Sequence, residues 1–207
     1  TYWRFAHFLF PFWTITPEGA FSHHVSLRAW APMDDHHTMM FNMAWNGNIR
    51  NPRVDLDGNP FPGSNPKIEY LPNSTDWLGR WRPVQRKEND YLMDRDVQRD
   101  GSYTGIEGII MQDQAITESM GEITDHGFEQ LAPSDRMITQ TRRRLLLAAR
   151  AIREKGETPP TVKNPTASLG ARGGEFLASQ ELDWEAAYRH ALEGIADPTG
   201  RFQHAAE

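Results

Sequence analysis

Residues 24–45 read HVSLRAWAPMDDHHTMMFNMAW, and this stretch does most to predict the fold. From His24 to Ala31, apolar and polar side chains alternate, which is the two-residue period of a half-buried strand. A second strand is expected from Thr38 to Trp45. Asp34 and Asp35 lie between the two and favour a tight turn. We therefore predict an antiparallel β-hairpin.

The residues before this hairpin extend the same sheet. A strand candidate runs from Tyr2 to Ile15 and is broken by Pro11. It is crowded with large aromatic side chains, namely Trp3, Phe5, Phe8, Phe10, Phe12 and Trp13. Aromatic residues favour strands and fill large apolar interiors. The pattern predicts a sheet that lines a roomy apolar space.

A long amphipathic helix is expected further along, from Ser134 to Lys155. Its apolar residues recur at spacings of three and four: Ile138, Thr141, Leu145, Ala148, Ala149 and Ile152. Ser134 is the expected N-cap, and Gly156 ends the helix. The predicted class is α+β, with a twisted antiparallel sheet packed on this helix. The Arg142–Arg144 run on the opposite face is interpreted as a solvated face rather than a docking patch.

Composition excludes several classes of function. The net charge is −6 and no basic stripe runs between the aromatics, so a nucleic-acid partner is not expected. Apolar runs are too short for a membrane span, and there is no cysteine, which suits a cytoplasmic protein. The expected organisation is a catalytic or binding domain at 1–155, a Gly/Pro-rich linker at 156–178 and a helical extension at 179–207. Because Thr1 opens directly on a strand pattern, we expect a portion of a longer polypeptide.

Residues 109–121, IIMQDQAITESMG, hold the most informative carboxylate, Asp113. It precedes a helix-like stretch, Ala115 to Met120, so it is either a helix N-cap or a ligand for a metal. Glu118 comes five residues later and would not share a helix face with Asp113, which argues against a paired-carboxylate device. The histidine pairs His23–His24 and His36–His37 flank the hairpin and are interpreted mainly as its solvated ends.

Two longer segments resemble one family. Residues 89–126, NDYLMDRDVQRDGSYTGIEGIIMQDQAITESMGEITDH, and 134–149, SDRMITQTRRRLLLAA, resemble the C-terminal catalytic region of Rieske non-heme iron oxygenases. The most similar group is phthalate dioxygenase-like and includes aromatic O-demethylases. Its QDxAxxESMG element matches Gln112 to Gly121. Residues 9–17 and 28–45 also resemble strands of that group's catalytic domain.

The resemblance implies a helix-grip fold and a mononuclear Fe(II) held by two histidines and one carboxylate, with Asp113 as the carboxylate. It also implies a [2Fe–2S] Rieske cluster, an electron-transfer reductase, O₂ and a homotrimer or larger assembly. The substrate would be an aromatic acid or aryl ether that is hydroxylated or O-demethylated. Arg4 and Arg28 are candidates for pairing with a substrate carboxylate.

The sequence also departs from that family. A Rieske cluster needs two cysteines and two histidines, and this chain has no cysteine. The family's D-x-x-H-x-x-x-x-H-like element is also absent, since Asn42 stands where Asp34 and His37 would require the second histidine. We expect the Rieske domain and the histidine-bearing segment to precede Thr1. The alternatives are a non-catalytic helix-grip module that binds an apolar aromatic ligand and, less favoured, a structural subunit.

Overall fold

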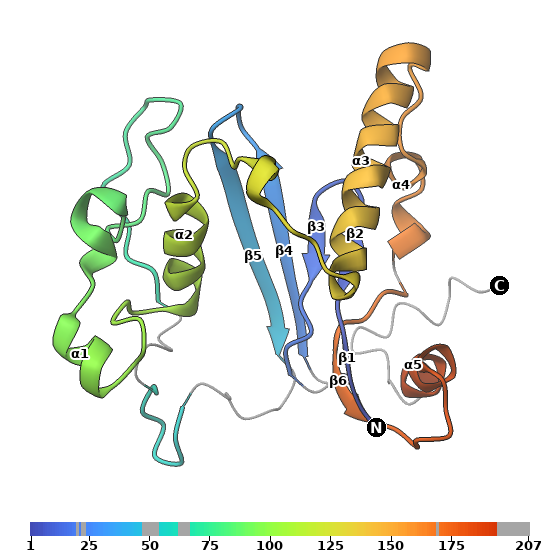
Figure 1. Cartoon of the computed structure of the whole chain (residues 1–207), viewed down its shortest axis with the longest axis horizontal. Helices are drawn as coiled ribbons and strands as arrows, with labels where there is room; N and C mark the ends of the chain where they lie inside the picture. The colour runs from blue at the N-terminus through green and yellow to red at the C-terminus, as the bar shows by residue number, and fades with distance from the viewer. Residues whose placement is uncertain (20, 22–23, 47–53, 62–66, 169, 194–207) are drawn as a thin grey trace. The chain divides into compact units, whose positions relative to one another are not determined.

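The computed structural model describes residues 1–19, 21, 24–46, 54–61, 67–168 and 170–193. The chain divides into two compact units, Thr1–Arg50 with Gln130–Glu207, and Asn51–Glu129. Unit 1 contains β1 Tyr2–Phe5, β2 His7–Leu9, β3 Trp13–Ile15, β4 His24–Pro32, β5 Thr38–Asn46, η3 Pro133–Asp135, α3 Arg136–Lys155, α4 Pro160–Lys163, η4 Pro165–Ser168, β6 Gly174–Leu177 and α5 Trp184–Glu193. Unit 2 contains η1 Lys87–Leu92, α1 Arg95–Asp100, α2 Ile109–Ser119 and η2 His126–Phe128. This mixture of helices and antiparallel sheets confirms the α+β class (Figure 1).

The predicted hairpin is confirmed. β4 and β5 pair in antiparallel register from His24 opposite Asn46 to Pro32 opposite Thr38. In the turn between them, one carboxylate oxygen of Asp34 accepts the backbone N–H groups of His36, at 2.8 Å, and His37, at 2.7 Å. These hydrogen bonds favour the ionised form and lower the pKa of Asp34 below its ordinary value. Asp34, predicted from the sequence to favour the turn, therefore closes the hairpin through these hydrogen bonds.

The hairpin belongs to a four-stranded sheet in the order β2-β3-β4-β5. Directly opposed residues lie on the same face of a sheet, and Ala29 opposes both Trp13 and Phe41. Ala29 is buried, whereas Phe41 keeps 53% of its surface exposed. On the same face, Met43 opposes Leu27 and is 47% exposed. This apolar face thus continues uncovered onto β5.

The N-terminal strand forms three short strands, with Pro11 in the turn between β2 and β3. β1 does not join the four-stranded sheet but pairs with β6, which lies in the segment expected to be a linker. The segment 156–178, expected to be a Gly/Pro-rich linker, holds α4, η4 and β6. Phe5 of β1 stacks on Phe176 of β6 and contacts Tyr188 of α5, with ring centroids 5.6 and 4.7 Å apart. Aromatic packing therefore ties the C-terminal helix to the first strand.

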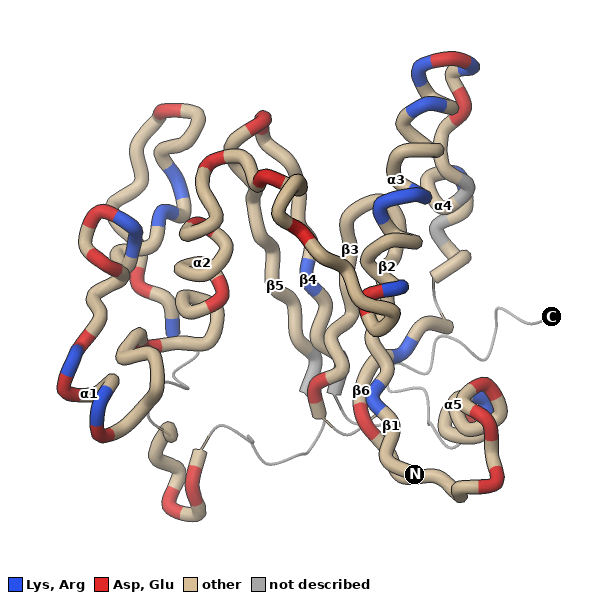
Figure 2. Tube along the Cα trace, in the orientation of Figure 1, with Lys and Arg blue, Asp and Glu red and all other residues tan. Residues whose placement is uncertain are grey.

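The long helix forms as predicted, but its surroundings differ from the prediction. α3 begins at Arg136 after the short η3, so Ser134 is not its N-cap, and it ends at Gly156 in the left-handed conformation (φ 68°). No α3 residue is buried, and apolar side chains along it stay exposed: Met137, Ile138, Leu145, Leu146, Leu147 and Ile152. Figure 2 shows the basic residues spread along the same helix. The predicted packing of the apolar stripe on the sheet is thus not seen among the described residues. No helix in the described part of the chain is long and apolar enough to span a membrane.

Candidate functional site

Helix α2 carries the predicted ligand Asp113, and it starts earlier than the sequence indicates. The N-cap position is Gly108, whose φ of 88° is a conformation that glycine adopts without a steric penalty. Ile109 follows as the first helical residue, so Asp113 is the fifth residue of the helix. The expectation that Asp113 stands at a helix start is therefore wrong, and the N-cap alternative is excluded. The pair Ile109–Ile110 has a strand-like preference and hides the true start.

One face of α2 is anchored in the core of unit 2. Met111 is only 2% exposed and clusters with Tyr91 and Ile106, both buried. Ala115, one turn after Met111, packs against the same cluster. The Gln112 side-chain amide adds a hydrogen bond to the Ile106 carbonyl at 2.9 Å. These contacts determine which side of α2 faces inward.

Asp113 lies on the other side of α2. Two residues after Met111, at about 100° per residue, its side chain projects roughly opposite the buried face. It is exposed, and the neighbours one and two turns away on its face are apolar and also exposed: Ile109, Ile116 and Met120. Among the described residues, no hydrogen bond or ion pair of the Asp113 carboxylate is found. The structure thus presents a lone carboxylate beside three exposed apolar side chains and the polar Thr117.

Glu118 has a different set of partners, as the spacing predicts. One of its carboxylate oxygens accepts the phenolic O–H of Tyr91, and the other accepts the Gln114 side-chain amide at 2.6 Å. Burial, reinforced by this hydrogen bond and the Glu118 charge, raises the pKa of the Tyr91 phenol well above its ordinary value. Tyr91 therefore acts as a permanent donor at neutral pH. Glu118 is occupied by this structural role and is not a second carboxylate beside Asp113.

The sequence gives almost no signal for the importance of Tyr91. It lies in η1, within a run of three residues with positive φ, namely Asp90, Tyr91 and Leu92, at 50°, 56° and 53°. Aspartate tolerates this left-handed region, but tyrosine and leucine rarely enter it. No pattern of spacing or polarity announces such a run.

The histidines and arginines singled out from the sequence lie in unit 1. His36 and His37 are exposed in the hairpin turn, as predicted, and His37 Nδ1 lies 2.9 Å from Asp34. His23 is outside the described residues. Arg28 pairs with Glu18 at 3.2 Å, and Arg4 reaches only the Pro17 carbonyl, at 3.4 Å. Within the described residues, no three His, Cys, Asp or Glu side chains are placed to hold a metal ion.

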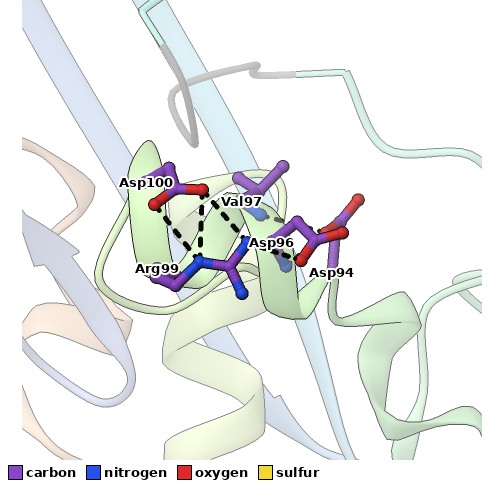
Figure 3. A network of polar contacts seen from close by, with 5 residues as sticks. All are labelled: Asp94, Asp96, Val97, Arg99 and Asp100. Carbon is purple, nitrogen blue, oxygen red and sulfur yellow. Dashed lines mark hydrogen bonds and ion pairs between the residues drawn. The ribbon is translucent and has the colours of Figure 1, made fainter.

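A second group of carboxylates, on and before α1, is explained by local structure (Figure 3). Asp94 caps this helix by accepting the backbone N–H groups of Asp96 and Val97. Arg99 pairs with Asp96 at 2.8 Å and with Asp100 at 3.2 Å. These side chains are exposed, and each carboxylate has a local partner, either Arg99 or the backbone at the start of the helix. They cap α1, a helix of six residues, and pair along its exposed surface. Local structure therefore accounts for these carboxylates, and they are not taken as a metal site.

The donor chemistry of Asp113 fits one position of an iron site and no more. A carboxylate is a hard anionic ligand of the kind found in the two-histidine, one-carboxylate triad. A rigid helix anchored through its opposite face would hold such a ligand in place. The two imidazole positions are not filled by any described residue near it.

Comparison with known proteins identifies the family to which the chain belongs. Residues 1–194 match the family described as "LigXa C-terminal domain like". The chain is 48% identical over 200 residues to the 3-chlorobenzoate-3,4-dioxygenase oxygenase subunit of Comamonas testosteroni, covering 94% of the chain and 46% of that relative. It is 31% identical over 173 residues to the phthalate 4,5-dioxygenase oxygenase subunit of Pseudomonas putida, covering 81% and 37%. The resemblance seen in the sequence is confirmed, and the chain spans less than half the length of either relative.

Proposed function

The chain belongs to the LigXa C-terminal domain-like family, and from this premise we propose that it is the C-terminal catalytic part of a Rieske-type mononuclear iron oxygenase. Such an enzyme would use O₂ and reductase-supplied electrons to hydroxylate or O-demethylate an aromatic acid or aryl ether. The observation that carries the proposal is the state of Asp113. It is an exposed carboxylate without a partner among the described residues, and its helix face also exposes Ile109, Ile116 and Met120.

Asp113 is the residue that we assign to the metal. Carboxylates on protein surfaces are normally solvated or paired, and an apolar stripe around one indicates a face that becomes covered in the working protein. Once covered, Ile109, Ile116 and Met120 would exclude water around the ligand. The bound Fe(II) would supply the activation of O₂. Its two imidazole ligands would come from outside the described residues.

The sheet of unit 1 supplies a surface suited to an aromatic substrate. Trp13, Phe41 and Met43 lie on its apolar face, which continues uncovered onto β5. Aromatic and thioether side chains are effective contacts for a flat apolar ring. Arg28 is already paired with Glu18 and is a poor candidate for binding a substrate carboxylate.

The remaining features of the proposed enzyme are predictions. The [2Fe–2S] cluster, the reductase, the homotrimer and the cytoplasmic location belong to this reading, which rests on the similarity to oxygenase subunits. The alternative, a non-catalytic helix-grip module for apolar aromatic ligands, is not favoured, because both relatives are oxygenase subunits of aromatic dioxygenases. Iron content separates the two candidates.

The test is Asp113→Ala in the oxygenase subunit of which the chain forms part under this proposal. We expect loss of bound iron and of turnover with an unchanged circular-dichroism spectrum, because the Asp113 side chain makes no contact on which α2 depends. The matched control is Asp100→Ala, which removes an exposed carboxylate that pairs with Arg99 in the same unit. Wild-type iron stoichiometry in the Asp113 variant would refute the assignment.

A further inference from the structure

We propose that Tyr91 and Glu118 are positioning residues for Asp113, acting through the hydrogen bond between them. The inference rests on the proposed function, because it takes Asp113 as a metal ligand. Neither residue is expected to touch iron, substrate or O₂. Their role is to set the rotation of α2 about its axis, and with it the direction in which the Asp113 carboxylate points.

The first support is the backbone of η1. Asp90, Tyr91 and Leu92 are all in the left-handed region, which costs non-glycine residues roughly 1–2 kcal/mol each. Such strain persists only where the surroundings over-determine the conformation, and it is concentrated at functional sites. Here the strained run turns the Tyr91 side chain into the core of unit 2, where its ring clusters with Ile106 and Met111.

The second support is the set of hydrogen bonds that hold this turn. The Asn89 side chain accepts the Arg86 N–H at 2.9 Å and donates to the Val84 carbonyl at 2.8 Å. The Gln85 amide donates to the carbonyls of Tyr91, at 3.3 Å, and Glu107, at 3.0 Å. Gln85 therefore links the strained turn to the segment just before α2.

The third support is the geometry of α2 itself. Glu118 follows Met111 by two helical turns and lies on the same inward side, whereas Asp113 projects from the other. Met111 is an apolar contact and is directionally tolerant, while both oxygens of Glu118 are engaged by directional donors. With side chains reaching about 5–6 Å from the axis, a 20° rotation of α2 would move the Asp113 carboxylate by roughly 2 Å. Metal ligands tolerate only about 0.5 Å, so a directional lock on the inner face matters for the outer one.

The experiment measures cobalt(II) in place of iron, in the same subunit. Three variants are compared: Tyr91→Phe, Glu118→Gln and the double variant. Cobalt(II) affinity is measured by titration, and the visible absorption of the bound ion reports its coordination geometry. The matched control is Tyr103→Phe, which removes a phenolic hydroxyl from a tyrosine of the same unit that is 99% exposed.

We expect each single variant to bind cobalt(II) about 10–100-fold more weakly, with a changed absorption spectrum, as when an outer partner of a ligand is lost. The double variant should bind cobalt(II) no more weakly than either single variant, because both substitutions remove the same hydrogen bond. The amide that replaces the Glu118 carboxylate can still accept the hydrogen bond from Gln114, and Tyr91→Phe leaves no phenol without an acceptor. A merely structural role would lower thermal stability and leave the spectrum of the bound ion unchanged. The Tyr103 control should match the wild type.

Affinity within twofold of the wild type and an unchanged spectrum in both single variants would overturn the positioning role. That result is distinguishable from failure of the proposed function, which would appear as full cobalt(II) binding by Asp113→Ala. Should Tyr91→Phe fail to fold, Glu118→Gln alone decides the question, since it keeps the size of the side chain and one acceptor.

Discussion

The orientation of α2 can be tested by comparing two apolar truncations on its opposite faces. Met111→Ala removes a side chain that is 2% exposed and leaves a cavity between Tyr91 and Ile106. Truncations of this kind cost about 2–5 kcal/mol. Ile116 is 66% exposed, so only about a third of the roughly 1.5–3 kcal/mol available from full burial is at stake, or about 0.5–1 kcal/mol. The better helix propensity of alanine offsets part of that loss.

The assay is amide hydrogen exchange of α2 in the intact chain, which reports local opening free energies without assuming that the two units unfold together. Met111→Ala should lower the protection of the α2 amides by at least about 1 kcal/mol more than Ile116→Ala does. Equal losses in the two variants would refute the reasoning, because they would mean that both faces of α2 are covered. Asp113 would then not lie on an open face.

Two further predictions concern the turns. The pKa of Asp34 is lowered in the folded state, so its hydrogen bonds stabilise the hairpin fully above the ordinary carboxyl pKa of about 4. This stabilisation is lost as the pH falls through the lower pKa of the folded state. NMR titration of the His36 N–H should show the loss, and the titration should be absent in Asp34→Asn. Gly105 and Gly156 have nearly equal φ angles, 66° and 68°, but an added Cβ would lie 2.3 Å from the Asp94 carbonyl oxygen at Gly105 and would meet nothing within 4 Å at Gly156. Gly156→Ala should therefore cost about 1–2 kcal/mol, and Gly105→Ala at least about 1 kcal/mol more, in urea denaturation; equal costs would contradict the crowding at Gly105.

The sequence predicts local structure well where one period or one turn governs it. The β4–β5 hairpin follows from alternation and from the Asp34 turn, and the end of α3 follows from Gly156. The β1–β6 pair could not be predicted in the same way, because it joins residues 169 to 175 positions apart and β6 has only four residues. The start of α2 was hidden for another reason, since two isoleucines follow a glycine whose positive φ begins the helix.

The candidate site was predicted only in part. The family element around Asp113 was recognisable, and of the two roles considered for Asp113 the structure excludes capping, whereas the ligand role stays a prediction. The contribution of Tyr91 depends on a left-handed backbone run and on a contact across 27 residues, neither of which leaves a periodic trace. Which side chains position a ligand depends on three-dimensional packing, so no local sequence pattern predicts them.

The two faces of α2 together explain why the site looks incomplete and why it can nevertheless be ordered. The inner face is satisfied within unit 2 by Met111 and by the Tyr91–Glu118 bond, so α2 does not depend on a metal for its place. The outer face, with Asp113 among exposed apolar residues, is unsatisfied among the described residues. Under the proposed function, a carboxylate already held in place by α2 would lower the entropy cost of metal binding. It follows that weakening the inner face should reduce metal affinity even though no inner-face residue is assigned to the metal.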